Sequence, residues 1–167
     1  EFGRTIDAFD FLHAGGDTMI ARYGTTEQKE KYLRPLCNGE MFVAIGMTEP
    51  DAGSDVASIQ TSAVKEGDNY IINGDKRFTT LGDVADIIKL FAVTDKVKRA
   101  KGGISCFLFE TDTPGFSVTK VQETMGNKGM HQCEEVFENC VVPAESMLGP
   151  EGEGLNIFGK SYAEGRG

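Results

Sequence analysis

The sequence contains no tryptophan and only two histidines, and it lacks the signatures on which many catalytic sites depend. His13 and His131 show neither HExxH nor another paired-ligand spacing, which argues against a metal site. Neither GxGxxG nor a Walker loop occurs, so a nucleotide bound through those motifs is excluded. The absence of a GxSxG elbow leaves acyl-enzyme chemistry without a nucleophile.

Long apolar runs and an excess of basic residues are also absent. No run approaches the roughly 20 apolar residues that a membrane-spanning helix needs, so we expect no membrane span. Asp and Glu number 26 against 17 Lys and Arg, and the net charge of −9 argues against a nucleic-acid partner. The four cysteines show no CxxC spacing. A chain of 167 residues with 40% hydrophobic content is long enough to bury one core.

The first part of the chain has the pattern of helices. Between Thr5 and Leu36 the apolar residues recur at helical rather than alternating spacing. One helix is expected to begin at Thr25 or Thr26, where a hydroxyl can cap exposed amides. The expected interruptions and ends of the helices are Gly15-Gly16, Gly24, Pro35 and Gly39.

After Gly39 the pattern changes to short β-rich runs separated by turn residues. Gly67-Asp68 and Asn73-Gly74 are both expected to form tight turns, which makes residues 59–80 a three-stranded meander. About eight strands at this spacing predict an antiparallel barrel or a pair of orthogonally packed sheets. The expected strands are Met41–Met47, Ile59–Val64, Tyr70–Ile72, Lys76–Thr80, Asp86–Val93, Ile104–Glu110, Phe116–Val121 and Cys133–Val142.

These patterns predict the α+β class. Residues 1–40 are expected to be the end of an N-terminal helical domain, and residues 41–150 a middle β-domain. Residues 151–167 carry Leu155 and Phe158 at helical spacing and are expected to begin a C-terminal helical domain.

Polar groups gather at the ends of two expected strands. In residues 46–55 a strand ends in a hydroxyl, a proline turn and a small-residue loop. Exposed amides with the Thr48 and Ser54 hydroxyls would offer hydrogen bonds to a polar ring and a phosphate. An ordinary turn is the alternative, because Pro, Asp and Gly are good turn formers. The second group is Phe78-Thr79-Thr80, for which alternating core packing is the alternative.

Taken together, the chain resembles the acyl-CoA dehydrogenase family. Several separate blocks in one order carry the resemblance over most of the chain, which makes it more specific than any single block. The blocks are Tyr23–Lys29, Tyr32–Leu36, Gly39-Glu40, Thr48–Asp55, Ile72–Lys76, Thr113–Gly115, Met125-Gly126, Val141–Pro143 and Gly152–Gly154.

The resemblance implies FAD as cofactor. In this family the counterpart of residues 45–54 contacts the flavin, and the serine that matches Ser54 lies near the FAD pyrophosphate and the bound acyl-CoA. Phe78 stands where the family usually has tryptophan, and Thr80 matches a threonine that hydrogen-bonds near flavin N5. The cofactor-binding residues implied are Ile45, Met47, Thr48, Ser54, Phe78, Thr79 and Thr80.

The resemblance also implies α,β-dehydrogenation of an acyl-CoA thioester to a trans-2-enoyl-CoA, with a carboxylate base and hydride transfer to flavin N5. We expect no catalytic residue in this chain, and we expect the base after Gly167. Some branches carry the base just before the arginine that matches Arg166, where this chain has Gly165. Glu164 is one position away, which on a helix turns its side chain by about 100°. The chain alone is therefore expected to be inactive.

A basic cluster lies between two expected strands. Lys98 and Lys101, with Lys96 and Arg99 beside them, would attract the phosphates of CoA. Lysines that protect a sheet edge are the alternative reading. The segment at Met130 and Gln132 departs from the family pattern, which often has Ser and Thr there.

The implied partners are the acyl-CoA substrate, an electron-transferring flavoprotein and further copies of the protein in a tetramer or dimer. The family occurs in the mitochondrial matrix and the bacterial cytoplasm. An acyl-CoA oxidase and a non-catalytic acyl-CoA or partner-binding β-domain are the alternatives. The type of acyl chain is not predicted, because helices outside this sequence largely decide it.

Overall fold

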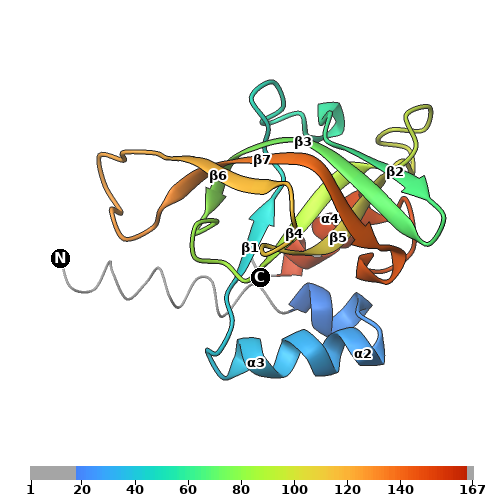
Figure 1. The fold of residues 1–167 in the computed structure, drawn as a ribbon, viewed down its shortest axis with the longest axis horizontal. Helices are drawn as coiled ribbons and strands as arrows, with labels where there is room; N and C mark the ends of the chain where they lie inside the picture. The colour runs from blue at the N-terminus through green and yellow to red at the C-terminus, as the bar shows by residue number, and fades with distance from the viewer. Residues whose placement is uncertain (1–17, 165–167) are drawn as a thin grey trace.

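The computed structural model describes residues 18–164, in which a curled sheet packs against short helices (Figure 1). The expected helix from Thr5 to Gly15-Gly16, together with His13, Gly165 and Arg166, lies outside the described residues. The elements are a helix at 18–23, α2 (Thr26–Gln28), the π-helical turn η1 (Lys29–Leu33), α3 (Arg34–Cys37), β1 (Val43–Gly46), the 3-10 helix η2 (Val56–Ser58), β2 (Ser62–Glu66), β3 (Asn69–Thr80), β4 (Ile87–Val93), β5 (Ile104–Glu110), β6 (Phe116–Val121), β7 (Gln132–Pro143), the 3-10 helix η3 (Ala144–Ser146) and α4 (Gly154–Glu164).

The helix that begins at α2 starts where the sequence predicts. The Thr25 hydroxyl accepts a hydrogen bond from Gln28 N at 3.2 Å, and the Gln28 side chain accepts one from Thr25 N at 3.1 Å, which forms a capping box. The prediction that Pro35 ends this helix is wrong. Pro35 lies inside one continuous helical run from α2 through η1 to Cys37, and the π-helical turn η1 directly before it is the kind of local irregularity that accommodates a residue without an N–H. Gly39 follows with a φ of 71°, as the predicted stop requires.

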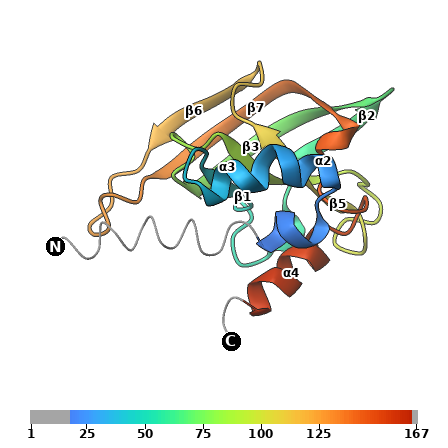
Figure 2. The ribbon, with the colours of Figure 1, turned by 90° about the horizontal axis from the view of Figure 1, so that it is seen from below.

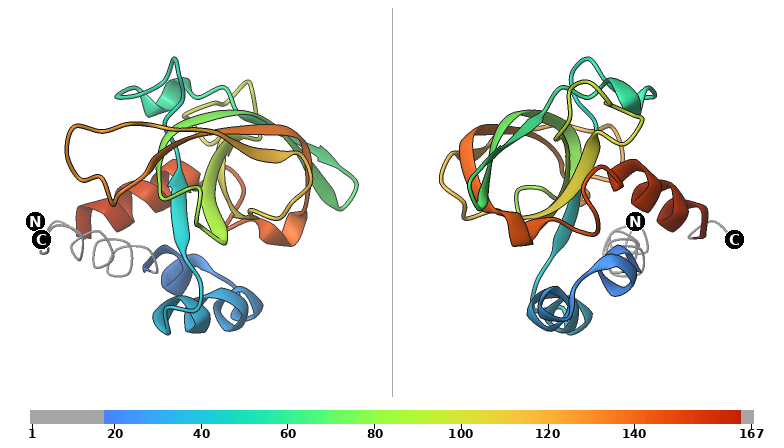
Figure 3. Two further views of the ribbon diagram at one scale, coloured as in Figure 1. Left: turned by 60° about the vertical axis from the view of Figure 1, so that its left-hand side comes forward. Right: turned by 90° about the vertical axis from the view of Figure 1, so that its right-hand side faces the viewer.

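The strands of the described residues form one mostly antiparallel sheet in the order β1-β4-β2-β3-β7-β6, with β5 paired to β4. β4 pairs in parallel with β1 and, at a single position, with β2, while the other pairs are antiparallel. Figure 3 shows the sheet curled into a half-barrel, with α2 and α3 below it and α4 beside it. The predicted α+β class with an antiparallel β-domain is therefore confirmed, and among the described residues this domain is one curled sheet of seven strands with two parallel pairings.

β3 is a single strand of 12 residues, so the hairpin predicted at Asn73-Gly74 is wrong. Its pairing with β7 instead shifts register between Ile72 and Gly74, as at a β-bulge. Gly74 has a φ of 152°, and a Cβ there would lie 2.6 Å from Thr61 Cα. Glycine at position 74 therefore allows β3 to lie close to Thr61, the residue directly before β2. The turn predicted at Gly67-Asp68 is confirmed, since it joins β2 to β3.

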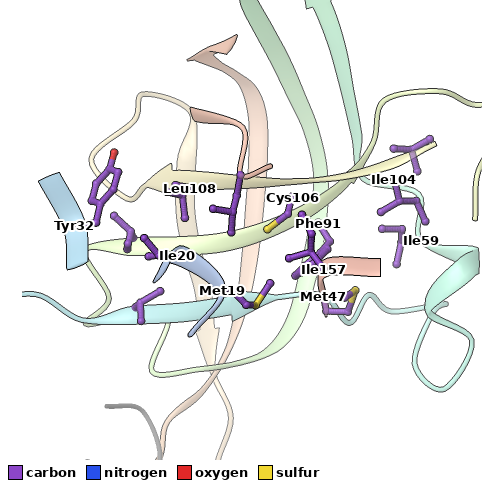
Figure 4. Packing of buried hydrophobic residues seen from close by; sticks show 14 of the residues in the cluster. Met19, Ile20, Tyr32, Met47, Ile59, Phe91, Ile104, Cys106, Leu108 and Ile157 are labelled. Carbon is purple, nitrogen blue, oxygen red and sulfur yellow. The ribbon is translucent and has the colours of Figure 1, made fainter. Parts of the chain in front are cut away.

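The core has two parts, one on each face of β4. All seven residues of β4 are buried, and its alternate side chains point to opposite faces. Phe91 lies in the cluster between the sheet and the helices, together with Ile20 and Ile157, as Figure 4 shows. Leu90 lies in the cluster inside the curl of the sheet. Figure 2 shows α4 to one side of the sheet, and its residue Ile157 belongs to the first cluster.

We predict that Gly74→Ala destabilises the protein by about 2–3 kcal/mol, because the added methyl group would overlap the Thr61 backbone. Gly53→Ala is the control, since a Cβ at Gly53 meets no atom within 4 Å. Urea unfolding measures both free energies. Equal values for the two variants would contradict the close approach at Gly74.

Candidate functional site

The two predicted strand ends are hydrogen-bonded neighbours. Arg77 N, near the end of β3, donates to Thr48 O at 2.8 Å, just after β1. The chain then folds back in a tight turn in which Glu49 and Ala52 exchange backbone hydrogen bonds of 2.9 and 3.2 Å. Residues 45–54 and 76–80, far apart in sequence, therefore form one edge of the molecule.

A buried ion pair supports this edge from below. Lys76 Nζ donates to Glu49 Oε1 at 2.8 Å and to Met47 O at 3.1 Å. Glu49 also accepts from Gln60 N at 2.6 Å and from Thr61 N at 3.0 Å. Glu49 and Lys76 are only 6% and 1% exposed, so each charge depends on the other.

The pKa values of the pair follow from burial and attraction. Burial lowers the pKa of Lys76 to about 8, although the Glu49 charge acts in the opposite direction. Burial alone would raise the pKa of Glu49, but the Lys76 charge and the hydrogen bonds outweigh it and lower this pKa.

At the end of β3 the backbone adopts an unusual conformation. Phe78 and Leu81 have φ values of 59° and 57°, in the left-handed region that side chains disfavour. The register with β7 shifts between Arg77 and Thr79, so Phe78 is the bulged residue. Phe78 as a whole residue is 54% exposed. Such local strain is found preferentially at functional sites.

The side chains on either side of this bulge have different partners. Thr79 is buried, and its hydroxyl donates to Glu135 Oε2 at 2.8 Å. Thr80 is half-buried, and its hydroxyl lies 3.2 Å from Gln132 Oε1. The Thr80 side chain and the Phe78 ring therefore face outward, while Thr79 anchors the segment to β7.

The remaining predicted flavin contacts differ in accessibility. Ile45 is 39% exposed and Thr48 half-buried. Met47 points into the core cluster beneath the sheet (Figure 4), and its carbonyl is bonded to Lys76. The side chains of Met47 and Thr79 are therefore not available to a ligand, which could contact only their backbone groups. Their role as flavin contacts stays a prediction.

The predicted CoA-binding residues lie on neighbouring loops. Ser54 is exposed on the loop after the Glu49–Ala52 turn. Lys98 and Lys101 are exposed on the loop of residues 94–103, which joins β4 to β5. The Arg99 side chain of that loop donates to Ile59 O at 3.3 Å, and Figure 3 shows both loops at the same end of the sheet.

Three buried charged residues of this edge were missed by the motif-based reading. Lys76 and Glu135 are directly opposite in the β3–β7 register, and Glu135 is fully buried. A signal was available: Glu135 alternates with Cys133 and Phe137, which are both buried in β7. An acidic residue at an inward position of a strand marks either a paired charge or a proton-binding site. The third residue is Glu49.

Among residues 18–164, no group of three or more His, Cys, Asp or Glu side chains is arranged to hold a metal ion. No helix in this part of the chain is long and apolar enough to cross a membrane.

Residues 44–140, which include both strand ends, match the family described as "Acyl-CoA dehydrogenase, middle domain". The chain belongs to the acyl-CoA dehydrogenase family. This membership confirms the resemblance found in the sequence. The curled sheet corresponds to the middle domain of this enzyme family.

Individual proteins of the acyl-CoA dehydrogenase family are similar over most of this chain. The short-chain-specific acyl-CoA dehydrogenase of Clostridium acetobutylicum is 48% identical over 149 residues, which are 89% of this chain and 39% of that protein. The structure of butyryl-CoA dehydrogenase from Megasphaera elsdenii superposes with a TM-score of 0.90 at 41% identity, covering 98% of this chain and 44% of that one.

A further match is a chain in a structure described as the electron transferring flavoprotein of Acidaminococcus fermentans. The TM-score is 0.90 at 43% identity, over 96% of this chain and 43% of that one. This chain thus spans about two fifths of the proteins it matches.

We predict that Glu49→Gln destabilises the protein by about 3 kcal/mol at pH 7, because Lys76 is left buried without its counter-charge. The pKa of Glu49 is lowered in the folded state, so its contribution is present above the unfolded pKa and is lost as the pH falls. The difference from the unsubstituted protein should therefore shrink below pH 4.5. Denaturant unfolding across this pH range measures it, with the exposed Glu123→Gln as control. A pH-independent difference would contradict the paired charge.

Proposed function

We propose that the protein that carries this chain oxidises an acyl-CoA thioester to a trans-2-enoyl-CoA and holds FAD at the edge formed by residues 45–54 and 76–80. The observation that carries this proposal is the 2.8 Å hydrogen bond from Arg77 N to Thr48 O. It brings together the two segments for which the family resemblance implies flavin contacts, and membership of the enzyme family supports it.

The residues present at this edge suit a flavin. The flavin ring system is flat, apolar on its faces and polar along one side, so it needs an apolar surface beside hydrogen-bonding groups. Phe78 offers an exposed ring, and Ile45 a second exposed apolar side chain. Thr48 and Thr80 lie half-buried and can hydrogen-bond to the polar side of the ring.

FAD, when bound, would supply the acceptor for the hydride that leaves the acyl chain. The part of the chain described by the structure would bind and orient. The buried Glu49–Lys76 pair holds the two segments together, and the strained backbone at Phe78 presents the ring outward. A rigid platform favours hydride transfer because the reacting atoms are held at a fixed distance.

The proton would be removed by a carboxylate outside the described residues. The resemblance implies a base after Gly167, because Gly165 stands where some branches carry it, and this remains a prediction. We therefore propose that residues 18–164 supply the cofactor platform and that the complete protein supplies the base.

The CoA moiety would lie along the rim that carries Ser54, Lys98 and Lys101. Ser54 offers a hydroxyl, and the two lysines offer positive charge to the CoA phosphates in a chain of net charge −9. The adjacency of their loops, through the 3.3 Å bond from Arg99 to Ile59, supports a shared role.

The other partners are proposed by analogy with the family. Electrons would pass to an electron-transferring flavoprotein, and a similar chain occurs in a structure described by that name. A homotetramer or homodimer, in the mitochondrial matrix or the bacterial cytoplasm, is proposed on the same basis.

The decisive experiment is the visible spectrum of the full-length protein, before and after anaerobic addition of acyl-CoA thioesters of different acyl chains. An oxidised-flavin spectrum that bleaches with one thioester would support the dehydrogenase. Rapid reoxidation by oxygen would favour the oxidase instead. If the folded protein bound no FAD even after reconstitution, both enzyme functions would be rejected and the non-catalytic binding module would remain.

We predict that Phe78→Ala weakens FAD binding about tenfold, because the apolar surface offered to the ring is lost. Val64→Ala is the matched control, since Val64 is also about half exposed (50%) but lies on β2. Flavin fluorescence titration of the apoprotein measures both dissociation constants. An unchanged constant for Phe78→Ala would place the flavin elsewhere.

We predict that the double substitution Lys98→Ala and Lys101→Ala weakens CoA binding by about tenfold at low ionic strength and less at high ionic strength, since salt screens exposed charges. Replacing the exposed Lys65 and Lys120 instead controls for net charge. Calorimetry with CoA at two salt concentrations measures the effect. An equal loss in both double variants would mean that only overall charge matters.

A further inference from the structure

Glu135 is a buried carboxylate with one unused oxygen directly beneath the edge proposed to hold the flavin. It is 0% exposed on β7. Oε2 accepts the hydrogen bond from Thr79 at 2.8 Å, whereas Oε1 has no hydrogen-bond partner among the described residues. Oε1 also occupies the space where a side chain at Gly82 would begin. An unpaired buried carboxylate oxygen is costly, so its retention calls for a reason.

The charges around Glu135 do not balance when all groups are ionised. Lys76 lies opposite it in the β3–β7 register, but the ammonium group contacts Glu49 at 2.8 Å. One buried cation therefore faces two buried carboxyls. Among the described residues, the thiol of Cys133 also faces Glu135; burial raises the pKa of this thiol to about 11, and the thiol donates to Asp83 at 3.4 Å. On the β6 side Glu135 is paired with Val118, which carries no charge.

Burial gives Glu135 a proton affinity that matters near neutral pH. Burial raises the pKa of its carboxyl to about 7, although the Thr79 hydrogen bond and the Lys76 charge oppose the rise. Both forms of the carboxyl are thus populated under ordinary conditions. The ionised form accepts a stronger hydrogen bond from Thr79 than the neutral form does.

The segment attached to Glu135 is under strain and needs external support. Phe78 and Leu81, which bracket Thr79 and Thr80, both have positive φ. Such conformations persist only where neighbouring contacts enforce them. Among the described residues these contacts come from β7 and the loop before it: the strand pairing of Thr79 and Thr80 with β7, the Thr80–Gln132 and Thr79–Glu135 side-chain bonds, and a backbone bond of 2.8 Å from Leu81 N to His131 O.

We propose that Glu135 is a positioning residue for the segment Phe78–Leu81, acting through Thr79, and that gain of a proton by its carboxyl loosens this segment. The proposal rests on the proposed function where it concerns FAD, since a looser segment holds the flavin less firmly. The part that concerns the position of the segment Phe78–Leu81 does not require a flavin and can be tested separately.

The first measurement is hydrogen exchange of the 78–82 amides in the full-length apoprotein at pH 6 and pH 8, corrected for intrinsic exchange. We expect protection of this segment to be roughly fivefold greater at pH 8, because the charge-assisted bond is then present. Glu135→Gln, which mimics the neutral carboxyl, should abolish the pH dependence. The matched control Glu138→Gln, exposed on the same strand, should retain it.

A pair of Thr79 variants separates positioning from bulk packing. Thr79→Val removes the hydroxyl and should abolish the pH dependence, while Thr79→Ser keeps the hydroxyl and should restore it. A pH-dependent protection in Glu135→Gln equal to that of the unsubstituted protein would overturn the proposal.

The second measurement is FAD affinity over the same pH range. We expect FAD to bind more tightly as the pH rises through about 7 in the unsubstituted protein and in Glu138→Gln, but not in Glu135→Gln. A pH-independent affinity beside pH-dependent exchange would overturn the link to the flavin. Absence of FAD binding in every variant would reject the proposed function, and the exchange data would still decide the role of Glu135.

Discussion

The buried contact between Lys76 and Glu49 is the interaction on which the candidate site depends. It joins the end of β1 to the middle of β3, and the same carboxylate accepts the amides of Gln60 and Thr61. Two segments with no sequence proximity thus meet at one charge pair shielded from water. Removing one member of such a pair costs about 3–5 kcal/mol, since it strands the other. The loop that carries Thr48 therefore has a defined position.

Shortly after Lys76 the backbone adopts a locally unfavourable conformation that leaves the ring of Phe78 partly exposed. A bulky residue in the left-handed region costs on the order of 1–3 kcal/mol. Phe78 and Leu81 both adopt it, and Leu81 is buried in return, whereas Phe78 stays 54% exposed. Burial therefore accounts for the strain at Leu81 but gives little reason for that at Phe78. A flat apolar ligand on the exposed ring would supply one, and buried Glu135 beneath the segment makes its support sensitive to protons.

The helices are held to the sheet by specific polar contacts as well as by the apolar core. The Gln28 side chain donates to Glu145 O at 2.8 Å and to Met147 O at 3.0 Å. The Tyr32 hydroxyl donates to Glu110 at 2.8 Å. Buried amides and hydroxyls of this kind fix orientation, because displacing them leaves donors unsatisfied. The segment predicted to end a helical domain thus has a fixed position on the β-domain.

The sequence by itself determined the features that depend on local pattern: the capping box at Thr25, the limits of β5 and β6, the Gly67-Asp68 turn and the family blocks. Only the tertiary structure decided the rest. Asn73-Gly74 has the composition of a hairpin turn, yet β7 pairs along the whole of β3 and converts it into a bulge. Likewise no local pattern places Glu135 against Thr79. Such contacts join distant strands, and their energies depend on burial and register, which a short window of sequence does not contain.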